Sequence, residues 1–178
     1  MNTLFRSRAR GEFFCVLNPD IRFKENPFLS LLSCFKVPSI GVVAPIVLDE
    51  QGEWDNNARC FPTPIKILCK AVGRRKESDY KVARDVVYPD WVAVMFMLFL
   101  SETFGGLGGF NERYFLYYED VDICARLQLN DYHVALCPGT KVTHYARRSS
   151  HRSFKYFYWH LTSMVRFFCS TIYRQLKC

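Results

Sequence analysis

The segment 108–126, with the sequence GGFNERYFLYYEDVDICAR, constrains the fold most because it sets charges within an aromatic, apolar stretch. Four acidic residues occur within eleven positions: Glu112, Glu119, Asp120 and Asp122. The glycines and aromatics predict a loop, and the acids that follow are typical of the first turn of a helix. Carboxylates beside aromatic walls can have shifted pKa values, which general-base chemistry uses. Composition alone leaves open the alternative that these acids only cap the helix.

The composition indicates a globular domain with an anionic partner. The chain has 178 residues, which suits one domain or part of a larger one. Its hydrophobic content of 49% can form a core, and its net charge of +7 favours nucleotide phosphates, nucleic acid or an anionic membrane. No secretory signal is evident in residues 1–10, and the eight cysteines show no CxxC pair. These features predict a cytoplasmic protein with reduced, buried cysteines.

Apolar runs predict an α/β fold. The run 12–17 predicts a buried strand that ends at Asn18-Pro19-Asp20, and Pro45 predicts an edge or bend in a second strand. Residues 53–89 are irregular and predict a long loop with a helix near 65–72. The other expected elements are helices at 27–35, 101–104 and about 153–177, and strands at 40–48, 91–100, 132–136 and 141–145.

Two of these strands place residues that can bind a metal ion. Asp20 follows a buried strand and His144 lies on a late strand, and such side chains suit Mg²⁺ or Mn²⁺ that bridges phosphates. A nearby carboxylate that binds no metal could deprotonate a hydroxyl nucleophile. Together these groups indicate transfer from a nucleoside diphosphate. For Asp20, an ordinary Asn-Pro-Asp turn is the alternative interpretation.

A series of short motifs in a fixed order carries a resemblance to a known family. They are Leu17-Asn18-Pro19-Asp20, Gly41-Val42-Val43-Ala44-Pro45, Asp90-Trp91-Val92, Gly108-Gly109-Phe110-Asn111-Glu112, Tyr118-Glu119-Asp120-Val121-Asp122, and Pro138 with Val142-Thr143-His144. The series resembles glycosyltransferase family 2, in its rhamnosyltransferase-like branch, over roughly residues 9–170. The resemblance implies a partial GT-A, Rossmann-like mixed sheet flanked by helices. It implies the C-terminal portion of a GT-A glycosyltransferase domain at 1–150 and a C-terminal amphipathic helical segment, basic and aromatic, at 151–178.

The resemblance also implies the roles of individual residues. Asp20 and His144 would bind a divalent cation, Mg²⁺ or Mn²⁺. Asp120 would be the base on the acceptor hydroxyl, with Glu119 as its acidic neighbour. The substrate-binding residues would be Asn18, Trp91, Val92, Ala93 and Arg147. The implied reaction is inverting transfer of a sugar, rhamnose in this branch, from a nucleoside diphosphate donor to a growing bacterial-type surface glycan with a saccharide or lipid-linked acceptor.

The sequence departs from the family at two places. The family has two or three βα units before the Asn-Pro-Asp strand, whereas only residues 1–11 precede it here. This difference predicts a truncated reading frame, a fragment or half of a split protein, and a chain that lacks transferase activity alone. The alternative function is thus a non-catalytic remnant or a partner-completed half. Val94 stands where the family usually has glycine, and its side chain is expected to crowd the donor pocket.

The C-terminal segment mixes basic and aromatic residues from 147 to 177. This pattern suits a helix that lies on an anionic leaflet at the inner face of the cell membrane, or an ordinary helix that packs on the sheet. Both interpretations stay open. A nucleic-acid-binding module is disfavoured because the basic residues form no recognisable binding motif.

Overall fold

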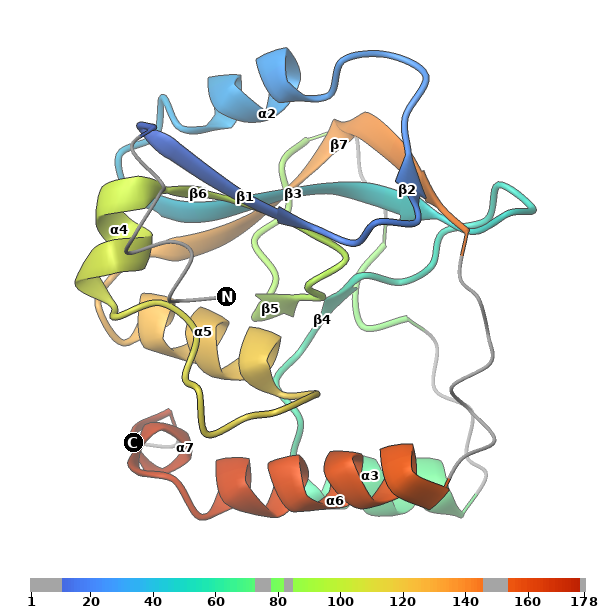
Figure 1. The fold of residues 1–178 in the computed structure, drawn as a ribbon, viewed down its shortest axis with the longest axis vertical. Helices are drawn as coiled ribbons and strands as arrows, with labels where there is room; N and C mark the ends of the chain where they lie inside the picture. The colour runs from blue at the N-terminus through green and yellow to red at the C-terminus, as the bar shows by residue number, and fades with distance from the viewer. Residues whose placement is uncertain (1–10, 73–77, 82–84, 146–153, 177–178) are drawn as a thin grey trace.

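A mixed five-stranded sheet forms the centre of the molecule (Figure 1). The computed structural model describes residues 11–72, 78–81, 85–145 and 154–176. The strand order is β1-β6-β3-β7-β2, in which β3 and β7 are parallel and the other neighbours are antiparallel. Two further strands, β4 and β5, form a separate small sheet. The strands are β1 (Phe13–Leu17), β2 (Ile21–Arg22), β3 (Ile40–Leu48), β4 (Ala58–Arg59), β5 (Trp91–Val92), β6 (Phe96–Leu100) and β7 (His133–His144).

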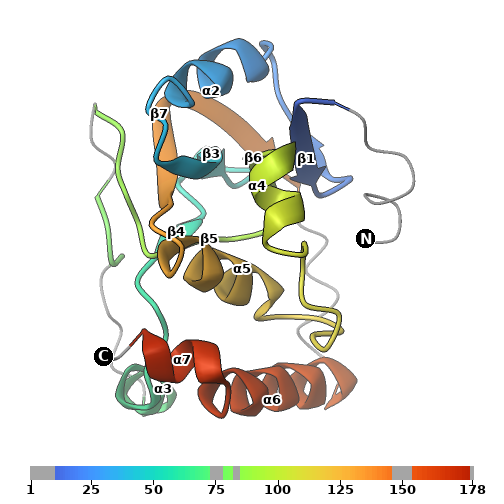
Figure 2. The same cartoon turned by 90° about the vertical axis from the view of Figure 1, so that its left-hand side faces the viewer.

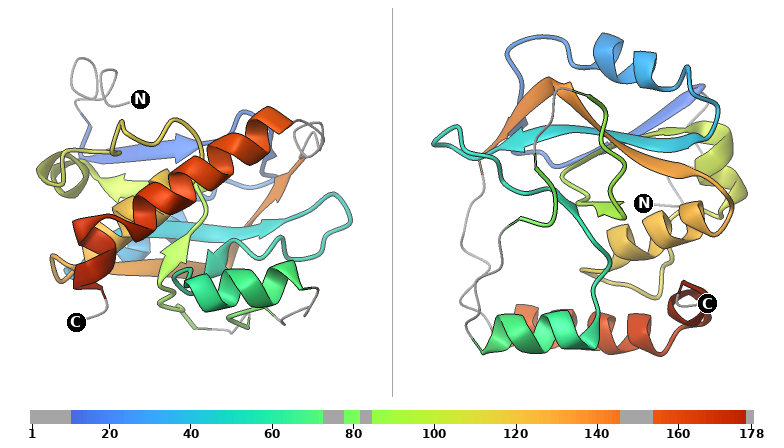
Figure 3. Two further views of the ribbon diagram at one scale, coloured as in Figure 1. Left: turned by 90° about the horizontal axis from the view of Figure 1, so that it is seen from below. Right: turned by 180° about the vertical axis from the view of Figure 1, so that it is seen from behind.

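Helices cover both faces of the sheet and add an outer layer. They are α2 (Phe28–Cys34), α3 (Pro64–Ala71), α4 (Ser101–Gly106), α5 (Glu119–Gln128), α6 (Phe154–Phe168) and α7 (Thr171–Gln175). Helix α2 lies on one face and α5 on the other, while α3 and α6 lie beyond α5 (Figures 1 and 2). The view from below shows α6 crossing the molecule with α3 beside it (Figure 3). The fold is therefore the expected α/β class, with a mixed sheet flanked by helices.

The central position of β3 explains its uniformly apolar sequence. Eight of its nine residues are buried because β6 and β7 flank it and helices cover both faces. At Gly41 an added Cβ would collide with Leu127 Cδ2 of α5, so this glycine allows the helix to approach the sheet closely. The expectation of an edge at Pro45 is wrong. Pro45 instead precedes a register shift against β7, at which the ladder bends.

Two predictions of strand boundaries are also wrong. The run 91–100 is not one strand, because β5 pairs with β4 and β6 pairs with β1 and β3, in different sheets. Conversely, the strands expected at 132–136 and 141–145 are the two halves of β7. That strand continues through Pro138-Gly139 by a bulge, since Cys137 pairs with Pro45 and Lys141 pairs with Ile46. Apolar periodicity reports burial, and it does not show which sheet a strand joins.

The C-terminal helices pack against α5 through an aromatic cluster. Tyr118, Phe167 and Tyr173 are buried in it with two residues of α5. The single helix expected at 153–177 is instead divided at Ser170, whose hydroxyl accepts a hydrogen bond from the Tyr173 N–H and caps α7. Within the described residues no helix is both long and apolar enough to span a bilayer.

One pair of cysteines comes into contact across the fold. The sulfur atoms of Cys34 of α2 and Cys137 of β7 lie against each other, although 103 positions separate the two residues in the sequence. The contact arises because α2 packs over β7. The free cysteines among the described residues are Cys15, Cys60, Cys69, Cys124 and Cys169.

Candidate active site

The ends of β1 and β7 bring Asp20 and His144 together. Asp20 lies in the turn between β1 and β2, and β2 pairs with the end of β7, where Ile21 faces His144. His144 Nε2 is 3.3 Å from Asp20 Oδ1, and His144 Nδ1 is 3.3 Å from Asp55 Oδ2. Asp55 therefore orients the ring through one nitrogen while the other nitrogen faces Asp20. This arrangement is the one that a metal-ligating histidine and its supporting carboxylate adopt.

The residues of this cluster fit a cation that is shared with a substrate. Asp20 Oδ1 is buried, and apart from its 3.3 Å contact with His144 Nε2 it has no hydrogen-bond partner among the described residues, which leaves a lone pair for a cation. No group of three or more His, Cys, Asp or Glu side chains in the described part of the chain could hold a metal by itself. Mg²⁺ is characteristically bound through one or two carboxylates, and water and substrate phosphates complete its shell. Asp20 supplies one such carboxylate and His144 adds an imidazole, so the pair fits a cation shared with a substrate and does not fit an all-protein cage.

The acidic pair opens α5 after a strained turn. Tyr117 and Tyr118 have φ values of 66° and 68°, a left-handed conformation that residues other than glycine rarely adopt. Tyr118 is buried, and its ring centroid is 5.6 Å from that of Phe167 in α6. Ser163 of α6 also donates a hydrogen bond to the Leu116 carbonyl oxygen at 2.8 Å. These contacts hold the turn, which directs Glu119 and Asp120 to the start of the helix.

Glu119 and Asp120 have different surroundings. Asp120 is only 9% exposed, and its carboxylate accepts hydrogen bonds from the backbone N–H groups of Val94 at 3.3 Å and Val121 at 2.9 Å. Burial raises the pKa of Asp120, while these hydrogen bonds and the nearby Arg59 lower it. Burial and the charge of Asp120 raise the pKa of Glu119 to about 7, and Glu119 Oε2 has no hydrogen-bond partner among the described residues. Both carboxyl groups therefore hold a proton more readily than ordinary acids.

Asp122 is a structural acid. It is 1% exposed and forms a salt bridge at 2.8 Å with Arg126, one helical turn later. Arg126 also donates hydrogen bonds to the carbonyl oxygens of Leu107 and Gly109. The pair thus fixes the glycine loop before α5, and Asp122 does not cap the helix. Asp120, by contrast, accepts the backbone N–H of Val121 in the first turn.

A short loop between β5 and β6 lies between the two acidic clusters. The Asn18 N–H donates to the Met95 carbonyl oxygen at 3.0 Å, and the Val94 N–H donates to Asp120. The Ala93 N–H donates to the carbonyl oxygen of Asn57 at 2.8 Å. The predicted substrate-binding residues Asn18 and Ala93 are thereby tied to the same loop that holds Asp120.

The remaining predicted substrate-binding residues have separate positions. Trp91 is partly buried, donates from Nε1 to the Cys60 carbonyl oxygen, and has the Arg59 guanidinium carbon 5.5 Å from its ring centroid. Val92 is fully buried, so its side chain serves the core. Arg147 lies outside the described residues.

Sequence reasoning missed three polar residues of this region. Asn57 is fully buried; its Oδ1 accepts from Trp54 Nε1 at 2.9 Å, and its Nδ2 donates to the Pro45 carbonyl oxygen at 2.9 Å. Asp55 and Arg59 contact His144 and Trp91, as described above. All three lie in the segment 53–89, which was predicted as a long loop with a helix near 65–72. The Asn56-Asn57 pair next to an apolar strand was the available local signal.

Known glycosyltransferases are similar to this chain in sequence. No protein-family model matches. The chain is 28% identical over 165 residues to rhamnosyltransferase WbbL of Escherichia coli (strain K12), covering 89% of this chain and 62% of that protein. It is 29% identical over 154 residues to the N-acetylglucosaminyl-diphospho-decaprenol L-rhamnosyltransferase of Mycobacterium tuberculosis (strain CDC 1551 / Oshkosh), covering 79% of this chain and 49% of that protein.

A solved structure shows the same fold. It is the crystal structure of GalNAc-T7 with UDP, GalNAc and Mn²⁺, with a TM-score of 0.63 and 15% identity over 92% of this chain and 32% of that one. The chain has a GT-A-like glycosyltransferase fold. The resemblance to rhamnosyltransferase-like glycosyltransferases is confirmed by the curated relatives. The chain spans less than two thirds of the length of the relatives that it matches.

Proposed function

We propose that this chain supplies the metal-binding and acceptor-activating part of an inverting glycosyltransferase. Its reaction moves a sugar, rhamnose in the first instance, from a nucleoside diphosphate donor to a saccharide or lipid-linked saccharide in glycan biosynthesis. The observation that carries the proposal is the loop at residues 93–95, which is hydrogen-bonded to Asn18 beside the Asp20–His144 pair and to Asp120. The rhamnosyltransferase relatives support the choice of sugar.

In this proposal one acidic cluster acts on the diphosphate leaving group and the other acts on the acceptor hydroxyl. Asp20 and His144 would hold Mg²⁺ or Mn²⁺, and the bound cation would supply positive charge beside the diphosphate leaving group. Asp120 accepts the proton of the acceptor hydroxyl while that oxygen forms a bond to the anomeric carbon and the bond to the diphosphate oxygen breaks. A direct displacement of this kind inverts the anomeric centre. Trp91 and Ala93 line the sugar side of the loop, and Asp120 is preferred to Glu119 as the base because it is hydrogen-bonded to this loop.

A transfer assay tests the proposal. One arm contains this chain alone, and the other contains it together with the part of the Escherichia coli relative that it does not match. Each arm receives a nucleoside diphosphate-rhamnose, a lipid-linked saccharide acceptor and Mn²⁺. We expect product in the second arm, and Asp120→Asn should lower its rate by about 10²–10⁴-fold. Glu112→Gln, which changes an exposed acid in the loop before α5, is the control.

The outcomes separate the alternatives. Product from the chain alone would show that the chain is a catalyst without a second segment. Product only in the second arm would support the partner-completed half. No product in either arm would contradict the catalytic role and favour a non-catalytic remnant. A larger loss for Glu119→Gln than for Asp120→Asn would transfer the role of base to Glu119.

Contact with the inner face of the cell membrane is a further part of the proposal, and it places the protein in the cytoplasm. The side chains of Phe154, Phe157 and Val165 on α6 are 82%, 62% and 52% exposed. The described part of α6 carries Lys155 and Arg166 and no acidic residue. We expect flotation with anionic vesicles, and the double change Phe154→Ser and Phe157→Ser should reduce it. Equal flotation of both proteins would contradict this contact.

A further inference from the structure

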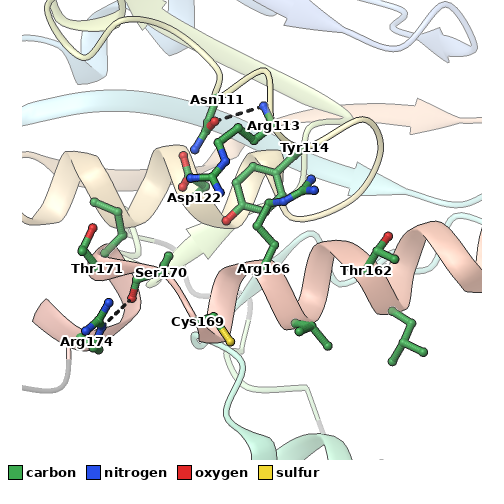
Figure 4. Close-up of a pocket in the computed structure, with 13 residues that line it drawn as sticks. Asn111, Arg113, Tyr114, Asp122, Thr162, Arg166, Cys169, Ser170, Thr171 and Arg174 are labelled. Carbon is green, nitrogen blue, oxygen red and sulfur yellow. Dashed lines mark hydrogen bonds between the residues drawn. The ribbon is translucent and has the colours of Figure 1, made fainter.

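A pocket opens between the loop before α5 and the C-terminal helices, with a volume of about 770 Å³. Figure 4 shows Arg113, Tyr114 and Asp122 on one wall, facing Arg166 of α6 and the start of α7. It is separate from the Asp20–His144 cluster, since none of its lining residues belongs to β1, β2 or β7. The pocket and the acidic pair share helix α5, because Asp122 lines the pocket and lies two positions after Asp120.

Positive charge dominates the wall of this pocket. Arg113, Arg166 and Arg174 supply three guanidinium groups, against the single carboxylate of Asp122. That carboxylate is already paired with Arg126, which is not a lining residue. Burial and the charge of Asp122 raise the pKa of Tyr114 to about 12, so its hydroxyl keeps a proton to donate at neutral pH. Guanidinium and phenol donors on opposite walls suit the oxygens of a phosphate.

One side of the pocket is apolar and leads onto exposed helix surface. Leu161 and Val165 of α6 line it and are 41% and 52% exposed. Phe154, Phe157 and Tyr158 precede them at helical spacing and are 82%, 62% and 58% exposed, so an apolar stripe runs along α6 from the pocket. Exposed aromatic side chains in one row offer contact to an apolar chain.

A buried acceptor completes the set of groups. Asp122 Oδ1 is buried at the wall, and no described residue donates a hydrogen bond to it. A buried acceptor of this kind is costly without a donor. A hydroxyl of a sugar or a protonated phosphate oxygen can supply the missing hydrogen bond.

We propose that this pocket binds a phosphate or diphosphate group attached to an apolar chain, with the phosphate at Arg113 and Arg166 and the chain along Leu161 and Val165. The assignment rests on the proposed function only in naming this ligand as the lipid-linked acceptor. The binding itself requires no transfer chemistry. A membrane phospholipid and a prenyl diphosphate share the recognised chemistry, so the experiment compares the two.

Binding is measured calorimetrically with farnesyl diphosphate, inorganic diphosphate and farnesol, in EDTA so that no cation recruits phosphate to Asp20. We expect farnesyl diphosphate to bind more tightly than the two partial probes because it uses both walls. Arg166→Gln should weaken its binding by about tenfold or more. Val165→Ser should weaken the binding of farnesyl diphosphate and leave the binding of inorganic diphosphate unchanged. Lys155→Gln, on the same helix but outside the pocket, is the matched control.

Competition then identifies the source of the phosphate. Displacement of farnesyl diphosphate by phosphatidylglycerol vesicles, but not by phosphatidylcholine vesicles, would support an anionic phospholipid head group. Resistance to both would support a terminal prenyl diphosphate. No binding of farnesyl diphosphate, or equal binding by wild type and Arg166→Gln, would overturn the pocket assignment. Glu119→Gln and Asp120→Asn should leave this binding intact, so a failed transfer assay and a failed pocket remain distinguishable.

Discussion

The acids of α5 and the acids around His144 differ in their access to water. The side chains of Asp20 and Asp55 are 34% and 40% exposed, whereas that of Asp122 is 1% exposed. On α5, burial raises the pKa values of Glu119 and Asp120. At the end of β7, two carboxylates flank one imidazole at the edge of the sheet. Open acids can share a cation with an incoming diphosphate, whereas buried acids can hold or accept a proton. The two clusters therefore suit different steps of one transfer.

The largest expected effect comes from the most buried acid. Arg126→Ala leaves the Asp122 carboxylate buried without its partner and removes two hydrogen bonds to the glycine loop. We expect the free energy of unfolding to fall by about 3–5 kcal/mol, measured by urea denaturation. Lys36→Ala, at an exposed position, is the control and should change it by less than about 0.5 kcal/mol. A loss below about 1 kcal/mol would show that Asp122 is not a structural acid.

The open cluster should respond in cation affinity more than in stability. Asp55→Asn weakens the contact that orients His144 through Nδ1. We expect Mn²⁺ to bind about 10–100-fold more weakly, measured by paramagnetic relaxation of water protons. Glu53→Gln, two residues earlier and exposed, should leave the affinity unchanged. Equal Mn²⁺ affinities for wild type and Asp55→Asn would show that Asp55 does not support cation binding by His144.

The smallest expected effect concerns the pH dependence of stability. Glu119 has a folded-state pKa of about 7, above its ordinary value of 4.5, so its ionised form is penalised in the folded protein. Its favourable contribution is present below pH 4.5 and is lost as the pH rises through 7. Glu119→Gln should therefore reduce the fall in unfolding free energy between pH 4.5 and 8, by on the order of 1 kcal/mol after allowance for partial exposure.

Glu112→Gln is the control for this measurement, because Glu112 is exposed in the loop before α5. The control should keep the wild-type dependence on pH. If Glu119→Gln and Glu112→Gln give the same curve, the contrast between buried and open acids does not extend to Glu119.

The sequence predicted the parts of this fold that depend on local patterns. The apolar runs of β1 and β3 and the acidic first turn of α5 each have a signal within ten residues or so. The division of 91–100 between two sheets has no such signal, because Trp91 and Phe96 are equally apolar. Asp55 was missed because its partner His144 is 89 positions away, and only the tertiary fold brings them together.

The left-handed turn at Tyr117 and Tyr118 decides where the chain can be divided. A non-glycine residue in this conformation costs roughly 1–2 kcal/mol, and here α6 supplies the compensating contacts with Tyr118 and Leu116. An engineer who shortens the protein near residue 150, where the sequence predicts a boundary, would remove that support and release the turn. The C-terminal helices therefore act as a brace for the acidic pair, and a minimal version of this protein has to retain them.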